Sequence, residues 1–278
     1  MMWPVLLLSC DREPTALSPI DEVDTTVEAD EDVVPLEPGW DAATVAAQIS
    51  VMLAYTAPDP VTINNDVFTW IMSQGDAKCP GTLSFRIGDC TASTGYRFFG
   101  IADYFEERSG EDEWWVSLSL GDMIITDPDG EAMLIGGTYE LERDGDRFAG
   151  EVTGTFSYPV LDGWVGEGGS FAWWLEADLA AGSERLQLDG ALGAGIGTGL
   201  HFDNITFGGS CGDDPTGAIQ LRDEGGRWSR LQLGEECGGC GELTYADQVD
   251  MGTACVDFGS FFEDTLQQLR AEPVVSVY

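Results

Sequence analysis

The chain has 278 residues, of which 50 are acidic and 12 are basic, and its formal net charge at pH 7 is −38. Because such a chain repels phosphate backbones, we expect no nucleic-acid partner. The sequence contains one histidine, His201, and no HExxH motif, so it carries no metalloprotease signature and offers a single residue for histidine-dependent nucleophilic catalysis. We predict no cofactor.

Residues 1–9 are dominated by a short apolar run that ends in small residues. The run is shorter than the roughly 20 apolar residues that a membrane-spanning helix needs, and it matches the pattern of a secretory signal. The final Leu7-Leu8-Ser9-Cys10 resembles the lipobox of bacterial lipoproteins. This resemblance implies cleavage before Cys10, a lipid on Cys10, and a membrane-anchored protein of the cell envelope, at the outer membrane or the cell surface.

Residues 10–38 have the composition of a tether. Residues 11–38 contain ten acidic residues, one basic residue and four prolines, and they contain no aromatic residue. Such a segment buries too little apolar surface to offset the entropy lost on ordering, and its like charges repel one another. We therefore predict a disordered acidic spacer between the lipid and the rest of the chain.

Residues 76–259 contain no linker-like break, so residues 39–278 are predicted to form a single domain. Helices are expected near its two ends. Asp41 can cap a helix over 42–55, with Val45, Ile49 and Leu53 on one stripe, and a second helix is predicted over 66–73. Ser260 and Glu263 form a predicted capping box that opens a helix over 260–271. We expect these helices to cover sheet edges or to close one end of the domain.

The middle of the domain is predicted to be mainly β. Apolar and polar residues alternate in 114–120, 148–156 and 171–179, which is typical of antiparallel strands with one buried face. Charged turns containing glycine separate these runs, and two similar segments, 137–148 and 217–228, are predicted hairpins. The glycine-rich stretch 192–200 is interpreted as one strand with a bare face. The expected fold is an antiparallel sandwich or barrel of meandering hairpins.

The six cysteines after Cys10 form an even set, which in an exported chain predicts three disulfides. We favour Cys79–Cys90, Cys211–Cys237, which flank a predicted hairpin, and Cys240–Cys255. Pairing of Cys211 with Cys240 and of Cys237 with Cys255 remains an alternative. Two other interpretations are weaker. The first is a redox motif at Cys237-Gly-Gly-Cys240, which has C-x-x-C spacing but no surrounding βαβ unit. The second is a zinc site formed by four of the cysteines, for which a second C-x-x-C is missing.

Two pairs of adjacent tryptophans are the candidate binding residues: Trp114 and Trp115, and Trp173 and Trp174. Strand alternation places the members of each pair on opposite faces, so one of each reaches the polar face, where it can stack on a sugar ring or contact another envelope protein. The sequence therefore predicts a non-enzymatic binding or structural protein.

Two alternatives remain open. The first is an extracellular glycan hydrolase that uses a carboxylate pair, which fifty acidic residues cannot single out. The second is a calcium-dependent surface protein, with Asp127, Asp129 and Glu131 as weak ligand candidates, although a plain hairpin turn is the favoured interpretation of that segment.

Overall fold

A computed structural model describes residues 37–55, 60–76, 79, 89–156, 169–194, 198–209, 211–223, 225–234 and 237–271. All of them belong to one compact unit, Glu37–Tyr278. The expected signal peptide, Cys10 and the tether up to residue 36 lie outside the described residues.

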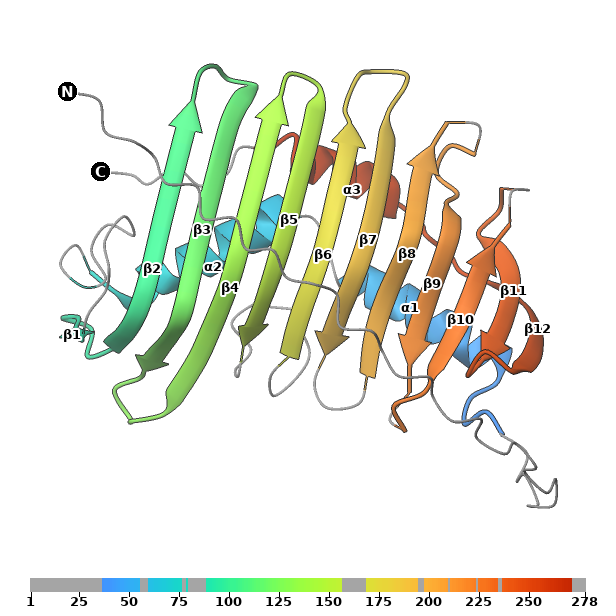
Figure 1. Cartoon of the computed structure of the whole chain (residues 1–278), viewed down its shortest axis with the longest axis horizontal. Coiled ribbons are helices and arrows are strands. Elements are labelled where there is room, and N and C mark those ends of the chain that lie inside the picture. Colours follow the sequence, from blue (N-terminus) through green and yellow to red (C-terminus); the bar gives the residue numbers. More distant parts are fainter. Residues whose placement is uncertain are drawn as a thin grey trace, which may run out of the picture. The chain divides into compact units, whose positions relative to one another are not determined.

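Twelve antiparallel strands form one sheet, and their order across the sheet is their order along the chain (Figure 1). The strands are β1 (Cys90–Thr91), β2 (Arg97–Arg108), β3 (Glu113–Thr126), β4 (Ala132–Asp144), β5 (Arg147–Phe156), β6 (Gly169–Asp178), β7 (Arg185–Ala194), β8 (Thr198–Gly208), β9 (Thr216–Arg222), β10 (Trp228–Leu233), β11 (Cys240–Tyr245) and β12 (Val249–Cys255). The mainly β, antiparallel class and its construction from successive hairpins are confirmed.

Alternation of side chains along the strands makes one face of the sheet the core. In β3, Trp114, Val116, Leu118 and Leu120 are buried, as the pattern predicts. The layer against this inner face consists of helices, whereas a sandwich would place a second sheet there. Figure 1 shows α1 (Ala42–Tyr55), α2 (Pro60–Gln74) and α3 (Phe261–Leu269) on the same side of the sheet. The predicted helices near both ends of the domain are confirmed. They cover a face of the sheet, so the expectation that they cover its edges or close one end of a barrel or sandwich is corrected.

Helix α1 (Ala42–Tyr55) has the predicted bounds. The Asp41 carboxylate accepts a hydrogen bond of 2.7 Å from the backbone N–H of Thr44, which is the geometry of an N-cap. Hydrogen bonding to the side chain of Thr44, and then to its backbone N–H, lowers the pKa of Asp41. Val45, Ile49 and Leu53 are buried, so the predicted apolar stripe is confirmed.

Helix α2 (Pro60–Gln74) begins six residues before the predicted start at Asp66. Proline fits the first position of a helix because its missing N–H would have no partner there. Pro60 also packs against β5 at Gly150, where an added Cβ would lie 2.5 Å from Pro60 Cγ. Burial of Val61, Ile63 and Val67 outweighs the modest helix propensity of the first turns.

Helix α3 (Phe261–Leu269) follows Ser260, but the predicted capping box is absent. The Ser260 hydroxyl donates its hydrogen bond to the Asp264 carboxylate and makes no cap bond to the backbone. The inward stripe is confirmed, since Phe262, Leu266 and Leu269 are buried. Phe262 stacks on Phe207 of β8 with ring centroids 5.5 Å apart, and this contact fixes α3 to the sheet.

The glycine-rich stretch 192–200 does not form one strand. Its two ends belong to β7 and β8, which pair so that Gly193 lies opposite Gly199 and Ala194 opposite Thr198. The stretch therefore spans a hairpin connection, of which residues 195–197 are outside the described part. The two predicted hairpins are confirmed as β4–β5 and β9–β10.

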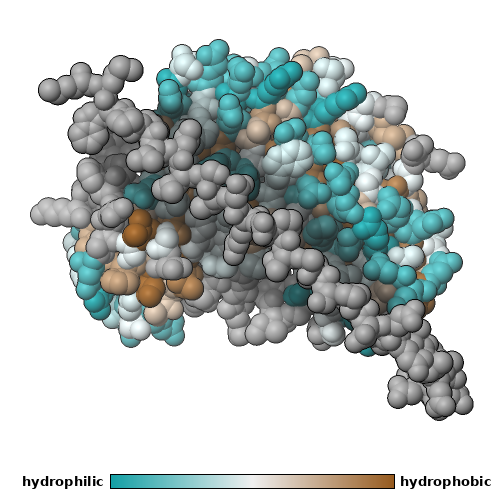
Figure 2. Space-filling model, viewed as in Figure 1, coloured by the Kyte–Doolittle hydropathy of each residue, from teal (hydrophilic) through white to brown (hydrophobic). Residues whose placement is uncertain are grey.

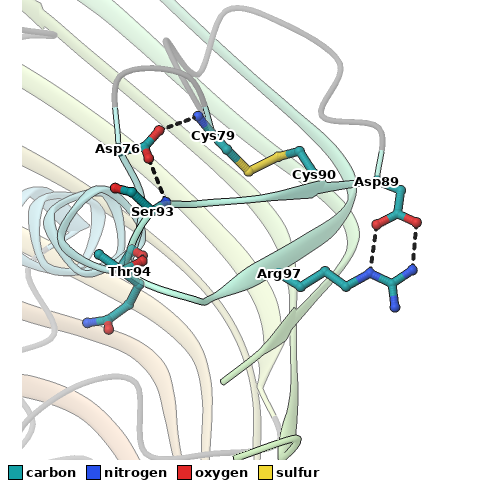
Figure 3. Close-up of a disulfide and its surroundings, with 8 residues drawn as sticks. Asp76, Cys79, Asp89, Cys90, Ser93, Thr94 and Arg97 are labelled. Atoms are coloured by element: carbon teal, nitrogen blue, oxygen red, sulfur yellow. Dashed lines mark hydrogen bonds and ion pairs between the residues drawn. A yellow bond between two sulfur atoms is a disulfide. The ribbon is translucent and has the colours of Figure 1, made fainter. Parts of the chain in front are cut away.

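The three favoured disulfides are all confirmed: Cys79–Cys90, Cys211–Cys237 and Cys240–Cys255. Cys240 and Cys255 lie directly opposite each other on β11 and β12. Figure 3 shows Cys79–Cys90 at the first edge of the sheet, where the Asp76 carboxylate accepts backbone hydrogen bonds from Cys79 (2.9 Å) and Ser93 (2.7 Å). These contacts join the end of α2 to the β1–β2 connection.

Candidate binding face

The tryptophan pairs divide between the two faces of the sheet as strand alternation requires. Trp114 and Trp173 belong to the core, and each is 3% exposed. Trp115 is 36% exposed on the outer face, and Trp174 is half-buried on the same face. The structure therefore leaves two of the four candidate tryptophans available to a ligand, and both lie on the face opposite the helices.

Trp115 belongs to an exposed apolar surface, which we call the β2–β4 patch. Its members are large apolar residues that are at least one-third exposed: Phe99, Ile101, Phe105, Trp115, Ile124 and Leu134. Phe99 lies opposite Ile124, which lies opposite Leu134 on the next strand. The rings of Phe105 and Trp115 are 5.2 Å apart. Figure 2 shows hydrophobic side chains gathered at the lower left of this face, in the region of β2–β4.

Five members of this patch were missed by sequence analysis, although adjacent apolar pairs signalled three of them, Phe99, Ile124 and Leu134. Phe98 and Phe99, Ile124 and Ile125, and Leu134 and Ile135 are adjacent large apolar residues on strands, as Trp114 and Trp115 are. The same alternation argument places one residue of each pair on the outer face.

Carboxylates border the Phe105–Trp115 pair and separate it from the other four members of the patch. Asp103 and Glu107 flank Phe105 along β2, and Trp115 lies directly opposite both Glu107 on β2 and Glu142 on β4. Arg97, at the start of β2, is held by the Asp89 carboxylate through two hydrogen bonds of 2.7 and 2.6 Å (Figure 3). Hydrogen bonding from Arg97 lowers the pKa of Asp89.

The centre of the outer face carries a pair of opposed carboxylates. Glu140 on β4 lies opposite Glu151 on β5, and Glu151 lies opposite Trp174 on β6. Thr138 and Thr153 join the two glutamates in lining a shallow hollow of about 240 Å³. The side chains of these two glutamates, two threonines and one tryptophan together provide hydrogen-bond acceptors, hydroxyl groups and one aromatic ring.

The outer face of β8–β10 has a different character. Asp203 on β8 forms an ion pair of 2.7 Å with Arg230 on β10, and the hydrogen bond from Arg230 lowers the pKa of Asp203. His201 lies near Gln220 and Trp228, with 3.4 Å between His201 Nδ1 and Gln220 Nε2. Asp203 also lies within electrostatic range of His201.

The candidate calcium ligands form a hairpin turn between β3 and β4. Asp127 Oδ1 accepts hydrogen bonds from the backbone N–H groups of Asp129 (2.9 Å) and Glu131 (2.8 Å). This carboxylate therefore stabilises the turn, as the favoured interpretation predicts. Within the described ranges, no group of three or more His, Cys, Asp or Glu side chains is arranged to hold a metal ion.

Comparison of the chain with protein-family models, with curated proteins and with solved structures gives no match. No helix in the described part of the chain combines the length and the apolar character needed to cross a membrane. The function is therefore inferred from the residues of this chain alone.

Proposed function

We propose that this protein is a lipid-anchored binding protein of the bacterial cell envelope. In this proposal Cys10 carries the lipid, residues 11–38 form the spacer, and the outer face of the sheet meets the ligand or partner. The single observation that supports a binding role is the exposure of six large apolar residues on one face of three neighbouring strands. Exposed apolar patches of this kind mark interaction sites because they cost free energy while they face water.

The cysteine arrangement supports export and anchoring. The chain has seven cysteines, and six of them form disulfides. Three disulfides are typical of proteins that fold in an oxidising compartment. Cys10 is the remaining cysteine, and it lies at the position where the lipobox resemblance implies lipidation.

Metabolic labelling with a palmitate analogue in a bacterial host tests the anchor. We expect label on the wild-type protein and none on Cys10→Ala, because the thiol is the acceptor. Thr15→Ala, in the spacer, serves as the matched control and keeps the label. Equal labelling of wild type and Cys10→Ala would contradict the proposed anchor.

Glycan hydrolysis is a second candidate because of the Glu140–Glu151 pair. Side chains directly opposite on antiparallel strands have Cβ atoms about 4.5–5.5 Å apart, so the two carboxyl groups can approach the separation of about 5–5.5 Å used by retaining glycosidases. A polysaccharide screen with wild type, Glu140→Gln and Glu151→Gln tests this candidate. We expect no turnover by any of the three, whereas wild-type turnover lost in both variants would establish hydrolysis.

A further inference from the structure

We infer that the β2–β4 patch docks a basic protein segment, in which lysine or arginine side chains surround an apolar centre. The inference depends on the binding role proposed above and does not require the lipid anchor. It names the class of partner from the chemistry of the surface.

The exposed large apolar side chains lie in two groups on the outer face. Phe105 and Trp115 form one group, the other four patch members form the second, and Asp103 lies between the two groups on β2. Among the described residues, the large apolar side chains with high exposure are the six patch members and Val51 on α1. The patch crosses three neighbouring strands, and its aromatic members, Phe99, Phe105 and Trp115, belong to the residue types that dominate binding energy at protein interfaces. Val51 stands alone on a helix and provides a natural control.

The carboxylates beside the patch favour a positively charged partner. Asp103, Glu107, Glu140 and Glu142 all lie on the outer face and are exposed. Arg97, the basic residue on this face of β2, is already engaged by Asp89. A lysine or arginine placed over Trp115 would meet the ring face between the Glu107 and Glu142 carboxylates, so cation–π attraction and ion pairing would act together.

The same charge disfavours the other occupants. A second copy of the chain would bring another net charge of −38, and an anionic membrane surface would also be repelled. Burial of the apolar centre by either of them would have to overcome this repulsion. A basic protein segment gains from both the apolar centre and the acidic border.

A peptide-binding experiment tests the inference. The probe is a short, blocked and fluorescently labelled peptide that alternates arginine and leucine, and binding to the purified full-length protein is followed by anisotropy. Two comparison peptides replace arginine with glutamate, or leucine with serine. We expect binding of the first peptide only, weakening but persisting as NaCl rises from about 50 to about 500 mM, because screening removes the charge contribution and leaves the apolar one.

Variants locate the binding surface. Phe99→Ser and Phe105→Ser are expected to weaken binding about tenfold each, as interface hot spots do. Glu142→Gln is expected to weaken it about threefold at low salt, and this difference should shrink at high salt. Val51→Ser and Glu263→Gln, which remove an exposed apolar group and an exposed charge elsewhere, should leave binding within about twofold. Circular dichroism verifies that each variant is folded.

Three results would overturn the inference. Equal binding of the arginine–serine peptide would show diffuse electrostatic attraction. Absence of binding, or equal binding to the Phe99→Ser and Phe105→Ser variants, would remove the patch as the site. Sedimentation showing a wild-type dimer that Phe105→Ser dissociates would make a second copy the occupant. Palmitate labelling is unaffected by any of these results, so a failure of the anchor and a failure of this docking surface are distinguishable.

Discussion

Adjacent residues on one strand can have opposite roles, and the Trp114–Trp115 pair is the clearest case. Trp114 is 3% exposed and contacts Phe148 in the core, whereas Trp115 is 36% exposed on the outer face. Sequence alternation alone predicted this division. It could not predict which faces would be covered, because that depends on the placement of helices far away in the sequence.

Truncation of the two tryptophans should therefore have unequal effects on stability. We expect Trp114→Ala to lower the free energy of unfolding by about 3–5 kcal/mol, because it leaves a cavity in a packed core. Trp115→Ala should lower it by less than about 1 kcal/mol, since its ring is partly solvated. Urea unfolding of the two variants measures the difference. Similar losses would mean that the outer face is also packed.

The Asp203–Arg230 pair predicts a pH dependence at the residue scale. The folded-state pKa of Asp203 lies below its ordinary value of 3.8, so its stabilising contribution is complete above that pH and is lost as the pH falls through the folded-state pKa. Both side chains are about one-third exposed. Asp203→Asn is therefore expected to cost no more than about 1 kcal/mol at pH 7.

Urea unfolding at neutral pH and near pH 2.5 checks this sign, with Glu242→Gln on β11 as the control for the loss of one negative charge. The deficit of Asp203→Asn relative to this control should shrink at the acidic pH. A deficit that grows on acidification would contradict the assigned ion pair.

At the scale of elements, patterns that carry strong periodicity were predicted well. The bounds of α1, the alternation in β3 and β6, and the two hairpins follow from spacing within a single segment. The start of α2 at Pro60 depends on a tertiary contact with Gly150. The Ser260 hydroxyl instead bonds a local competitor, the Asp264 carboxylate four residues along the chain, and so makes no capping bond. The prediction of a single strand over 192–200 was wrong because alternate glycines are compatible with both a bare strand and a hairpin.

The Cys240–Cys255 bridge tests the contribution of a disulfide to one element. It closes a loop of 15 residues and links directly opposed positions of β11 and β12. Its removal in a Cys240→Ala, Cys255→Ala double variant should lower the free energy of unfolding by about 3 kcal/mol. Urea unfolding against wild type gives the value, and an unchanged midpoint would show that the α1 contact with β12 suffices to hold this edge.

At the scale of the whole molecule, charge opposes compaction. The excess of 50 acidic over 12 basic residues means that folding brings like charges together. We therefore expect added NaCl, from about 20 to about 300 mM, to raise the melting temperature, because screening weakens repulsion more than it weakens the few ion pairs. Calorimetry at fixed pH measures this trend. A falling melting temperature would show that ion pairs dominate.

The meander order has a consequence for how the chain acquires its disulfides. Each strand pairs with the strand before it, and the bridges join cysteines that are consecutive in the sequence: 79 with 90, 211 with 237, and 240 with 255. An oxidant that pairs thiols in the order in which they emerge would produce these bridges directly, with no isomerase. This outcome requires that Cys10 is not a free thiol, because Cys10 emerges first and would otherwise form a disulfide with Cys79. Lipidation of Cys10, as proposed, would protect the order of all the pairs that follow.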